Sequence, residues 1–168
     1  TMIKRVIEHP RFAEFDLSSL QMLLYGAAPI DVALLEQAMA ALPATSFSQA
    51  YGMTELSPTV AVLMPHFHLP GPDRNRLLRA AGTPVPVAEI RIVDGEDNEL
   101  PPGQVGEIVA RGPMVMKGYW NKPAETEAAL RGGWMHTGDG GYMDEHGLLF
   151  VVDRMKDMIV SGGENVYS

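Results

Sequence analysis

The sequence predicts an α/β protein in which part of a parallel α/β unit is followed by a small antiparallel β-barrel or sheet. An apolar run at 20–25, a turn, a helical pattern and a second apolar segment at 45–50 succeed one another, as in a βαβ unit. Residues 87–93 then alternate between apolar and polar, which predicts a half-exposed strand. Short apolar segments separated by glycine and proline turns continue to residue 152.

Residues 1–85 are predicted to form the α/β unit. The chain opens in a helical pattern, and the run at 20–25 indicates a strand covered on both faces. A helix is expected to begin near Pro29 and to end at Pro43, with an apolar face made of Ile30, Leu34, Ala38 and Leu42. The turns at 26–29 and 51–55 follow the two strands, at the carboxyl edge where ligands of parallel sheets bind.

Residues 86–152 are predicted to form the β-barrel-like unit. Further short strands are expected around Val105, Ile108 and Val115, and residues 148–152 indicate a buried strand. One helix interrupts them, with Asn121 as the candidate N-cap and Pro123 in its first turn. A third unit, 153–168, begins at a charged break. The glycine-rich end leads us to expect that the sequence is an internal piece of a longer protein.

Composition disfavours several classes of protein. A formal net charge of −8 without a cluster of basic residues disfavours nucleic acid and anionic membranes as partners. The absence of cysteine removes disulfides and thiolate metal sites, and it fits a reducing compartment. His66 and His68 would share a strand face, but no carboxylate or cysteine set accompanies them, so we do not expect a metal there. No apolar run reaches the roughly 18 residues of a transmembrane helix.

Six motifs together resemble a known family. In chain order they are Tyr25-Gly26-Ala27-Ala28-Pro29; Gln49-Ala50-Tyr51-Gly52-Met53-Thr54-Glu55; Gly106-Glu107-Ile108 with Gly112 and Lys117-Gly118-Tyr119-Trp120; Trp134-Met135-His136-Thr137-Gly138-Asp139; Asp153-Arg154-Met155-Lys156-Asp157; and Ser161-Gly162-Gly163-Glu164-Asn165-Val166-Tyr167. Each motif alone occurs by chance, but six in this order do not. Over nearly its whole length the chain resembles the fatty-acyl and aryl-CoA synthetase branch of the adenylate-forming superfamily.

The resemblance implies a cytoplasmic ligase whose partners are small molecules. Such enzymes join a carboxylic acid to ATP, release pyrophosphate, and pass the acyl group from the adenylate to a thiol, here coenzyme A. The implied cofactors are ATP, Mg²⁺ and coenzyme A. Fatty, aryl and dicarboxylic acids all stay open as substrates, and so does a homo-oligomeric state.

Two implied catalytic residues are adjacent. The Glu55 carboxylate is expected to bind Mg²⁺, which needs only one or two protein carboxylates beside phosphates and water. The Thr54 hydroxyl is expected to contact the α-phosphate, whose charge grows in the transition state. The structural alternatives are a solvated glutamate at a helix start and an N-cap threonine.

Small and aromatic residues are expected to hold the adenine. By resemblance Tyr51 stacks on the base beside Gly52, while Gly26 and Ala27 line its other face, where small residues let backbone approach. Ala27 and Ala28, with Met53, are expected to border the acyl pocket, and the structural alternative is close packing of the turn. The structural alternative for Tyr51 is a core tyrosine.

The remaining implied contacts lie later in the chain. Asp139 is expected to accept hydrogen bonds from both ribose hydroxyls, and Arg154 to make the second ribose contact. Their structural alternatives are a turn aspartate and a surface ion pair. Lys156 is expected to be the hinge between the large and small domains, with a solvated loop lysine as the structural alternative. Gly162 and Gly163 would approach the pantetheine of coenzyme A, or form a plain β-turn.

The resemblance also implies parts that this sequence lacks. The family's phosphate loop lies upstream and its small-domain lysine lies downstream, so residues 1–168 alone are expected to be inactive. Where the rest of the sheet would pack, we expect an exposed apolar face. Two other functions stay open: an adenylation domain that loads a carrier protein, and a degenerate module that binds AMP without chemistry.

Overall fold

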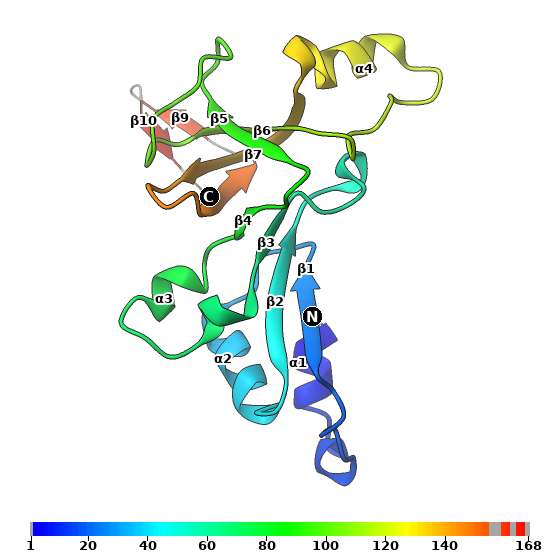
Figure 1. The fold of residues 1–168 in the computed structure, drawn as a ribbon, viewed down its shortest axis with the longest axis vertical. Helices are drawn as coiled ribbons and strands as arrows, with labels where there is room; N and C mark the ends of the chain where they lie inside the picture. Colours follow the sequence, from blue (N-terminus) through cyan, green and yellow to red (C-terminus); the bar gives the residue numbers. More distant parts are fainter. Residues whose placement is uncertain (1, 155–158, 162–163, 167–168) are drawn as a thin grey trace.

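The computed structural model describes residues 2–154, 159–161 and 164–166, with side chains described through residue 152. The described chain contains two four-stranded sheets and a short hairpin, arranged along one long axis (Figure 1). The helices are α1 (Met2–Ile7), α2 (Val32–Ala41), α3 (Arg74–Leu77) and α4 (Pro123–Ala129), with 3-10 turns η1 (Phe12–Glu14), η2 (Thr54–Leu56), η3 (Pro65–His68) and η4 (Arg131–Gly133). The strands are β1 (Met22–Gly26), β2 (Ser46–Tyr51), β3 (Ala61–Leu63), β4 (Thr83–Pro84), β5 (Glu89–Val93), β6 (Gly106–Arg111), β7 (Met135–Met143), β8 (Leu149–Arg154), β9 (Ile159–Ser161) and β10 (Glu164–Val166).

The first sheet has the order β1-β2-β3-β4 and contains the predicted βαβ unit. β1 pairs with β2 in parallel, and α2 connects them, as the sequence predicted. β2–β3 and β3–β4 are antiparallel. The expectation of a parallel sheet therefore holds for β1 and β2 alone among the described strands, because the connection from β2 to β3 is too short for a parallel crossover.

Helix α2 begins at Val32, three residues after Pro29. Its N-cap is Asp31, whose side chain accepts a hydrogen bond from the Leu34 N–H at 3.1 Å. The helix therefore starts near Pro29, as predicted, and the capping aspartate sets its first residue. Leu35, Ala38 and Leu42 are the buried residues of this segment, and they pack in one core cluster.

Strand β1 has one covered face and one uncovered face. Tyr25 is buried against α2 residues, whereas Met22 and Leu24 are 58% and 62% exposed. The expectation that both faces are covered is thus wrong within the residues that the structure describes. The uncovered side chains agree with the exposed apolar face that we expected on this sheet.

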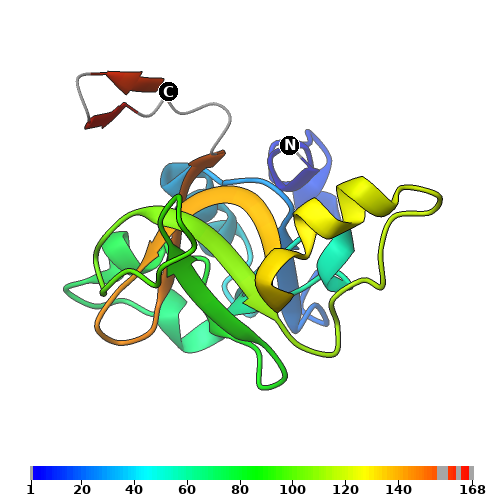
Figure 2. The same ribbon diagram turned by 90° about the horizontal axis from the view of Figure 1, so that it is seen from above.

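The second sheet is antiparallel throughout and has the order β5-β6-β7-β8. It is strongly curved, and β7 bends over as an arc (Figure 2). Val105 and Val115 lie outside its strands, so those two strand assignments are wrong. The N-cap of α4 is Lys122 and not Asn121, because Asn121 adopts a left-handed φ of 53°, a conformation that asparagine tolerates.

The two sheets share a core and are joined by backbone hydrogen bonds. The Ala81 N–H donates to the Leu149 carbonyl at 2.7 Å, and the Leu149 N–H donates to the Gly82 carbonyl at 2.8 Å. Ala61 and Ala81 pack with Ile92, Ile108 and Leu149, which come from the second sheet. This contact fixes the first sheet against β8 of the second sheet, and residues from both sheets line the candidate site. The division into 1–85, 86–152 and 153–168 stays a prediction.

Among the described residues, no helix is both long and apolar enough to cross a membrane.

A buried tyrosine–histidine pair holds the end of β1. His66 and His68 lie on η3, not on a strand, and His68 Nε2 is 2.9 Å from the Tyr25 hydroxyl. His68 Nδ1 lies 3.2 Å from the Met64 carbonyl, which accepts only. Nδ1 is therefore the donor to the Met64 carbonyl. Burial favours the neutral ring, and in the neutral ring Nε2 accepts the hydrogen bond from the Tyr25 hydroxyl.

Stability is expected to fall as pH drops because of this histidine. Burial lowers the pKa of His68 below its ordinary value of 6.5. Between the folded and unfolded pKa values the unfolded chain binds more protons, so the contribution is complete above about pH 6.5 and is lost progressively as pH falls through the folded pKa. Urea unfolding at pH 7.5 and pH 5 measures the loss. It should be smaller in His68→Gln and unchanged in His146→Gln; equal pH dependence in all three proteins would contradict the prediction.

Candidate functional site

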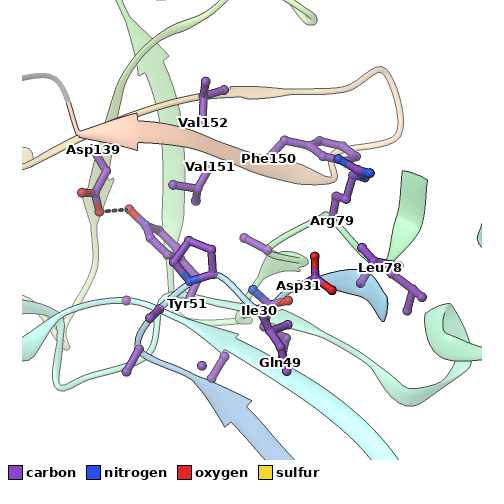
Figure 3. A pocket seen from close by; sticks show the side chains of 18 of the residues that line it. Ile30, Asp31, Gln49, Tyr51, Leu78, Arg79, Asp139, Phe150, Val151 and Val152 are labelled. Carbon is purple, nitrogen blue, oxygen red and sulfur yellow. Dashed lines mark hydrogen bonds between the residues drawn. The ribbon is translucent and has the colours of Figure 1, made fainter. Parts of the chain in front are cut away.

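The candidate site is a pocket of about 730 Å³ between the carboxyl ends of β1 and β2 and the second sheet (Figure 3). Its size is typical of a small-molecule site. Of the predicted site residues, the pocket brings together Gly26, Ala27, Ala28, Tyr51, Gly52 and Asp139. The location agrees with the carboxyl-edge rule for parallel strands.

The turn after β1 forms one wall of the pocket. Ala27 adopts a left-handed φ of 66°, which is uncommon for a residue with a Cβ and is typical of functional turns. A Cβ on Gly26 would lie 2.2 Å from the Ala50 carbonyl oxygen, and one on Gly52 would lie 2.0 Å from the Pro58 carbonyl oxygen. Glycine is therefore required at both positions because neighbouring backbone approaches too closely for a side chain.

Tyr51, the last residue of β2, also lines the pocket. Its hydroxyl donates a hydrogen bond to Asp139 Oδ2 at 2.8 Å, and Figure 3 shows the ring lying across the pocket. The ring is half-buried and also packs against two core clusters. Tyr51 thus has core contacts and lines the pocket, so the two interpretations of this residue are compatible.

Asp139 lies within β7, and not in a turn. It is opposite Arg154 in the β7–β8 ladder, which places the backbones of the two expected ribose residues side by side. The interpretation of Asp139 as a turn aspartate is wrong, since the strand continues to Met143. The Arg154 side chain lies outside the described part of the structure.

Thr54 and Glu55 lie on η2, next to the pocket residue Met53 but not among the residues that line the pocket. The N-cap of η2 is Met53, so the alternative of an N-cap threonine at 54 is wrong. Glu55 Oε1 accepts a hydrogen bond from the Tyr119 hydroxyl at 2.8 Å. This bond is the main reason that the pKa of Tyr119 is raised, and it keeps the phenol protonated as a donor.

The loop that carries Tyr119 is fixed on both sides. The Met116 N–H donates to the Glu55 carbonyl at 2.8 Å, and the Tyr119 N–H donates to Thr126 Oγ1 at 2.9 Å. Tyr119 stood in a family motif, but sequence reasoning gave it no role. Its contact with Glu55 spans 64 residues of sequence, so no local pattern could have identified it.

Sequence reasoning also missed several pocket residues. The wall opposite the turn comes from β8 and from the segment around α3, and its members that Figure 3 labels are Leu78, Arg79, Phe150, Val151 and Val152. The run at 148–152 was predicted to be a buried strand, which gave no signal for a ligand. Lys156, Gly162 and Gly163 lie outside the described residues, so their expected roles stay predictions.

Comparison with known proteins identifies the class to which this fold and pocket belong. Residues 1–120 match the AMP-binding enzyme family, and the chain belongs to it. Among curated relatives, the fatty acid–[acyl-carrier-protein] ligase ScoC of Streptomyces coeruleorubidus is 43% identical over 99% of this chain, and the long-chain-fatty-acid–CoA ligase of Escherichia coli O6:H1 is 40% identical over 99%. The chain spans 31% and 28% of those two proteins, so it covers about a third of the length of its relatives.

Solved structures agree with this membership. The amide bond synthetase McbA from Marinactinospora thermotolerans superposes with a TM-score of 0.89 at 40% identity, over 99% of this chain and 32% of that one. The O-succinylbenzoate coenzyme A synthetase of Bacillus subtilis, in complex with ATP and magnesium ion, gives a TM-score of 0.83 at 36% identity, over 99% and 32%. The α/β fold with a curved antiparallel sheet, and the resemblance to this superfamily, are confirmed.

Proposed function

We propose that this chain is the nucleotide-binding part of an ATP-dependent ligase that converts a carboxylic acid to an acyl-adenylate and transfers the acyl group to coenzyme A. The observation that carries the proposal is the hydrogen bond between Tyr51 and Asp139 across a pocket walled by the turn at 26–29. An aromatic face, a small-residue turn and a carboxylate match the base and the ribose of a nucleotide.

The nucleotide would lie with its adenine between Tyr51 and the turn, and its ribose at Asp139. In that position Asp139 is a positioning group for the sugar. Thr54 lies two residues beyond Gly52 on η2, where its hydroxyl would donate to the α-phosphate as negative charge grows. Arg154, Lys156, Gly162 and Gly163 keep their proposed roles as ribose contact, hinge and pantetheine-side glycines.

Mg²⁺ fits one carboxylate of this chain. Among the described residues no group of three His, Cys, Asp or Glu side chains could hold a metal ion. Glu55 would hold the ion together with phosphate oxygens and water, because this hard cation is usually bound through only one or two protein carboxylates. When bound, the ion supplies electrostatic stabilisation of the phosphates. Tyr119 would hold the Glu55 carboxylate in place by its 2.8 Å hydrogen bond.

The chemistry needs no general base in the first step. A carboxylic acid is ionised at pH 7, so its oxygen attacks the α-phosphorus directly while the bond to pyrophosphate breaks. The thiol sulfur then attacks the acyl carbon, loses its proton, and AMP leaves with the bonding electrons. The two steps together consume acid, ATP and thiol, and they yield the acyl thioester, pyrophosphate and AMP.

A second thiol acceptor is supported by one specific observation. The relative ScoC is a ligase of fatty acids to acyl carrier protein, and its identity to this chain, 43%, is as high as that of the feruloyl-CoA synthase from Amycolatopsis. Carrier-protein loading is therefore the alternative function. Supplying coenzyme A or a carrier protein to the adenylate and measuring thioester formation separates the two.

Acid-dependent ATP–pyrophosphate exchange tests the proposal. We expect the complete cytoplasmic protein that carries these residues to exchange label with at least one member of a panel of fatty, aryl and dicarboxylic acids. Residues 1–168 alone should give no exchange with the same acids. If the folded complete protein shows no exchange with any acid, the alternative of a module that binds AMP without chemistry is favoured. If residues 1–168 alone catalyse exchange, the expectation that they are inactive by themselves is contradicted.

A further inference from the structure

The segment that carries Asp139 is an irregularity in the β6–β7 ladder. Glu107 pairs with Gly140 and Val109 pairs with His136, so the single residue between them on β6 faces residues 137–139 on β7. Gly138, at the centre of this bulge, has a left-handed φ of 71°. Bulges of this kind redirect side chains beside functional sites, and here Asp139 lines the pocket.

Glu107 replaces a ladder partner for the backbone of the bulge. Its Oε1 accepts a hydrogen bond from the Gly138 N–H at 3.1 Å, and its Oε2 lies 2.9 Å from His136 Nδ1. Because an ionised carboxylate only accepts, Nδ1 of His136 is the donor. The two side chains are 16% and 6% exposed, so the network is largely shielded from water.

Thr137 makes two further hydrogen bonds within the bulge. Its hydroxyl donates to the Ile108 carbonyl at 2.7 Å and accepts from the Asp139 N–H at 3.1 Å. Two side chains, Glu107 and Thr137, thus accept hydrogen bonds from the amides of residues 138 and 139 within the bulge. Removing the acceptor of a shielded amide costs roughly 1–3 kcal/mol, so both side chains stabilise this backbone conformation.

We propose that Glu107, His136 and Thr137 are positioning residues that fix the β7 bulge and so aim Asp139 at the ribose hydroxyls. The inference rests on the proposed function, because it presupposes a nucleotide in the pocket. Glu107 and His136 stand in family motifs but touch no predicted ligand. Glu107 is connected to Asp139 through Gly138, and His136 through Thr137 and Gly138. Arg131 further restrains Glu107 at 3.2 Å.

The test compares AMP with 2′,3′-dideoxy-AMP by calorimetric titration of the complete protein. The wild type should bind AMP at least about tenfold more tightly, since each hydrogen bond to a charged group contributes about 1.5–3 kcal/mol. Thr137→Val should weaken AMP about fivefold to tenfold and dideoxy-AMP less than twofold, and Thr137→Ser should restore the difference. Thr45→Val is the matched control, because that hydroxyl also donates to a carbonyl, Leu20, but lies outside the pocket lining.

The outcomes separate the inference from the proposed function. Equal binding of both nucleotides by the wild type would remove the ribose role of Asp139 and the inference with it. Full discrimination by the wild type and by Thr137→Val alike would overturn the positioning role while the proposed function stands. If Thr137→Val loses affinity equally for AMP and for dideoxy-AMP, the positioning role is also overturned, because the substitution then causes a general binding defect.

A second variant decides the matter if Thr137→Val does not fold. Glu107→Gln keeps the side-chain volume but can present an NH₂ group to His136 Nδ1 and loses the charge that pairs with Arg131. We expect its preference for AMP over dideoxy-AMP to fall at least about threefold. An unchanged preference in this variant would overturn the positioning role.

Discussion

Glu55→Ala is expected to lower the rate of acid-dependent ATP–pyrophosphate exchange about a thousandfold in the complete protein. The variant removes the carboxylate proposed to hold Mg²⁺ and leaves the Tyr119 hydroxyl without its 2.8 Å acceptor. Losing one preorganised electrostatic contact to developing phosphate charge typically costs a factor of about 10²–10³, and the ion's position is lost as well. The rate should also require more Mg²⁺ for half-saturation.

The matched control for that experiment is Glu125→Ala. Glu125 is an exposed glutamate in the first turn of α4, and its pairing with Lys122 at 3.6 Å is a surface contact. Exchange by this variant should stay within about twofold of the wild type. A Glu55→Ala protein that retains a tenth or more of the wild-type rate, at an unchanged Mg²⁺ requirement, would refute the assignment of Glu55.

Gly52→Ala is expected to reduce the free energy of unfolding by about 3 kcal/mol or more. The added Cβ would lie 2.0 Å from the Pro58 carbonyl oxygen and 3.0 Å from the Thr59 Cα, and both are backbone atoms. Backbone cannot rotate aside as a side chain can, so the turn that connects β2 to η2 must shift. Urea unfolding of the complete protein, followed by circular dichroism, measures the change.

Gly95→Ala is the control that separates crowding from the general effect of adding a methyl group. Gly95 lies in the turn after β5, its φ is not in the left-handed region, and a Cβ there would meet nothing within 4 Å. Its free energy of unfolding should change by less than about 0.5 kcal/mol. Similar stabilities for the two variants would show that backbone approach does not restrict residue 52.

The elements that the sequence predicted best are those whose patterns are local. The βαβ order at 20–51 was confirmed, since apolar runs and a helical repeat report burial along short segments. A prediction failed where the conformation of one residue decided a boundary: Asn121 took a left-handed conformation instead of capping α4. Val105 and Val115 are apolar without being in strands, because turn residues can also be partly buried.

The candidate site was predicted as a set of residues, but not as an arrangement. Motif order identified Tyr51, Asp139 and the turn at 26–29, and the pocket brings them together. The β8 wall with Val151 was not predicted, because an apolar strand gives the same signal whether it faces core or ligand. The roles of Glu107 and Tyr119 were also missed, since each acts through a contact with another residue.

By itself the sequence determined the family, the order of its motifs and the types of most elements, because these depend on neighbouring residues and short repeats. The tertiary structure alone decided which distant groups meet. Tyr51 and Asp139 are 88 residues apart, Glu55 and Tyr119 are 64 apart, and Glu107 is 31 residues from Gly138. The contact between Glu107 and Gly138 forms where β6 pairs with β7 in the second sheet. The contact between Tyr51 and Asp139 forms because the shared core around Ile108 and Leu149 fixes one sheet against the other, and no local pattern in the chain records that packing.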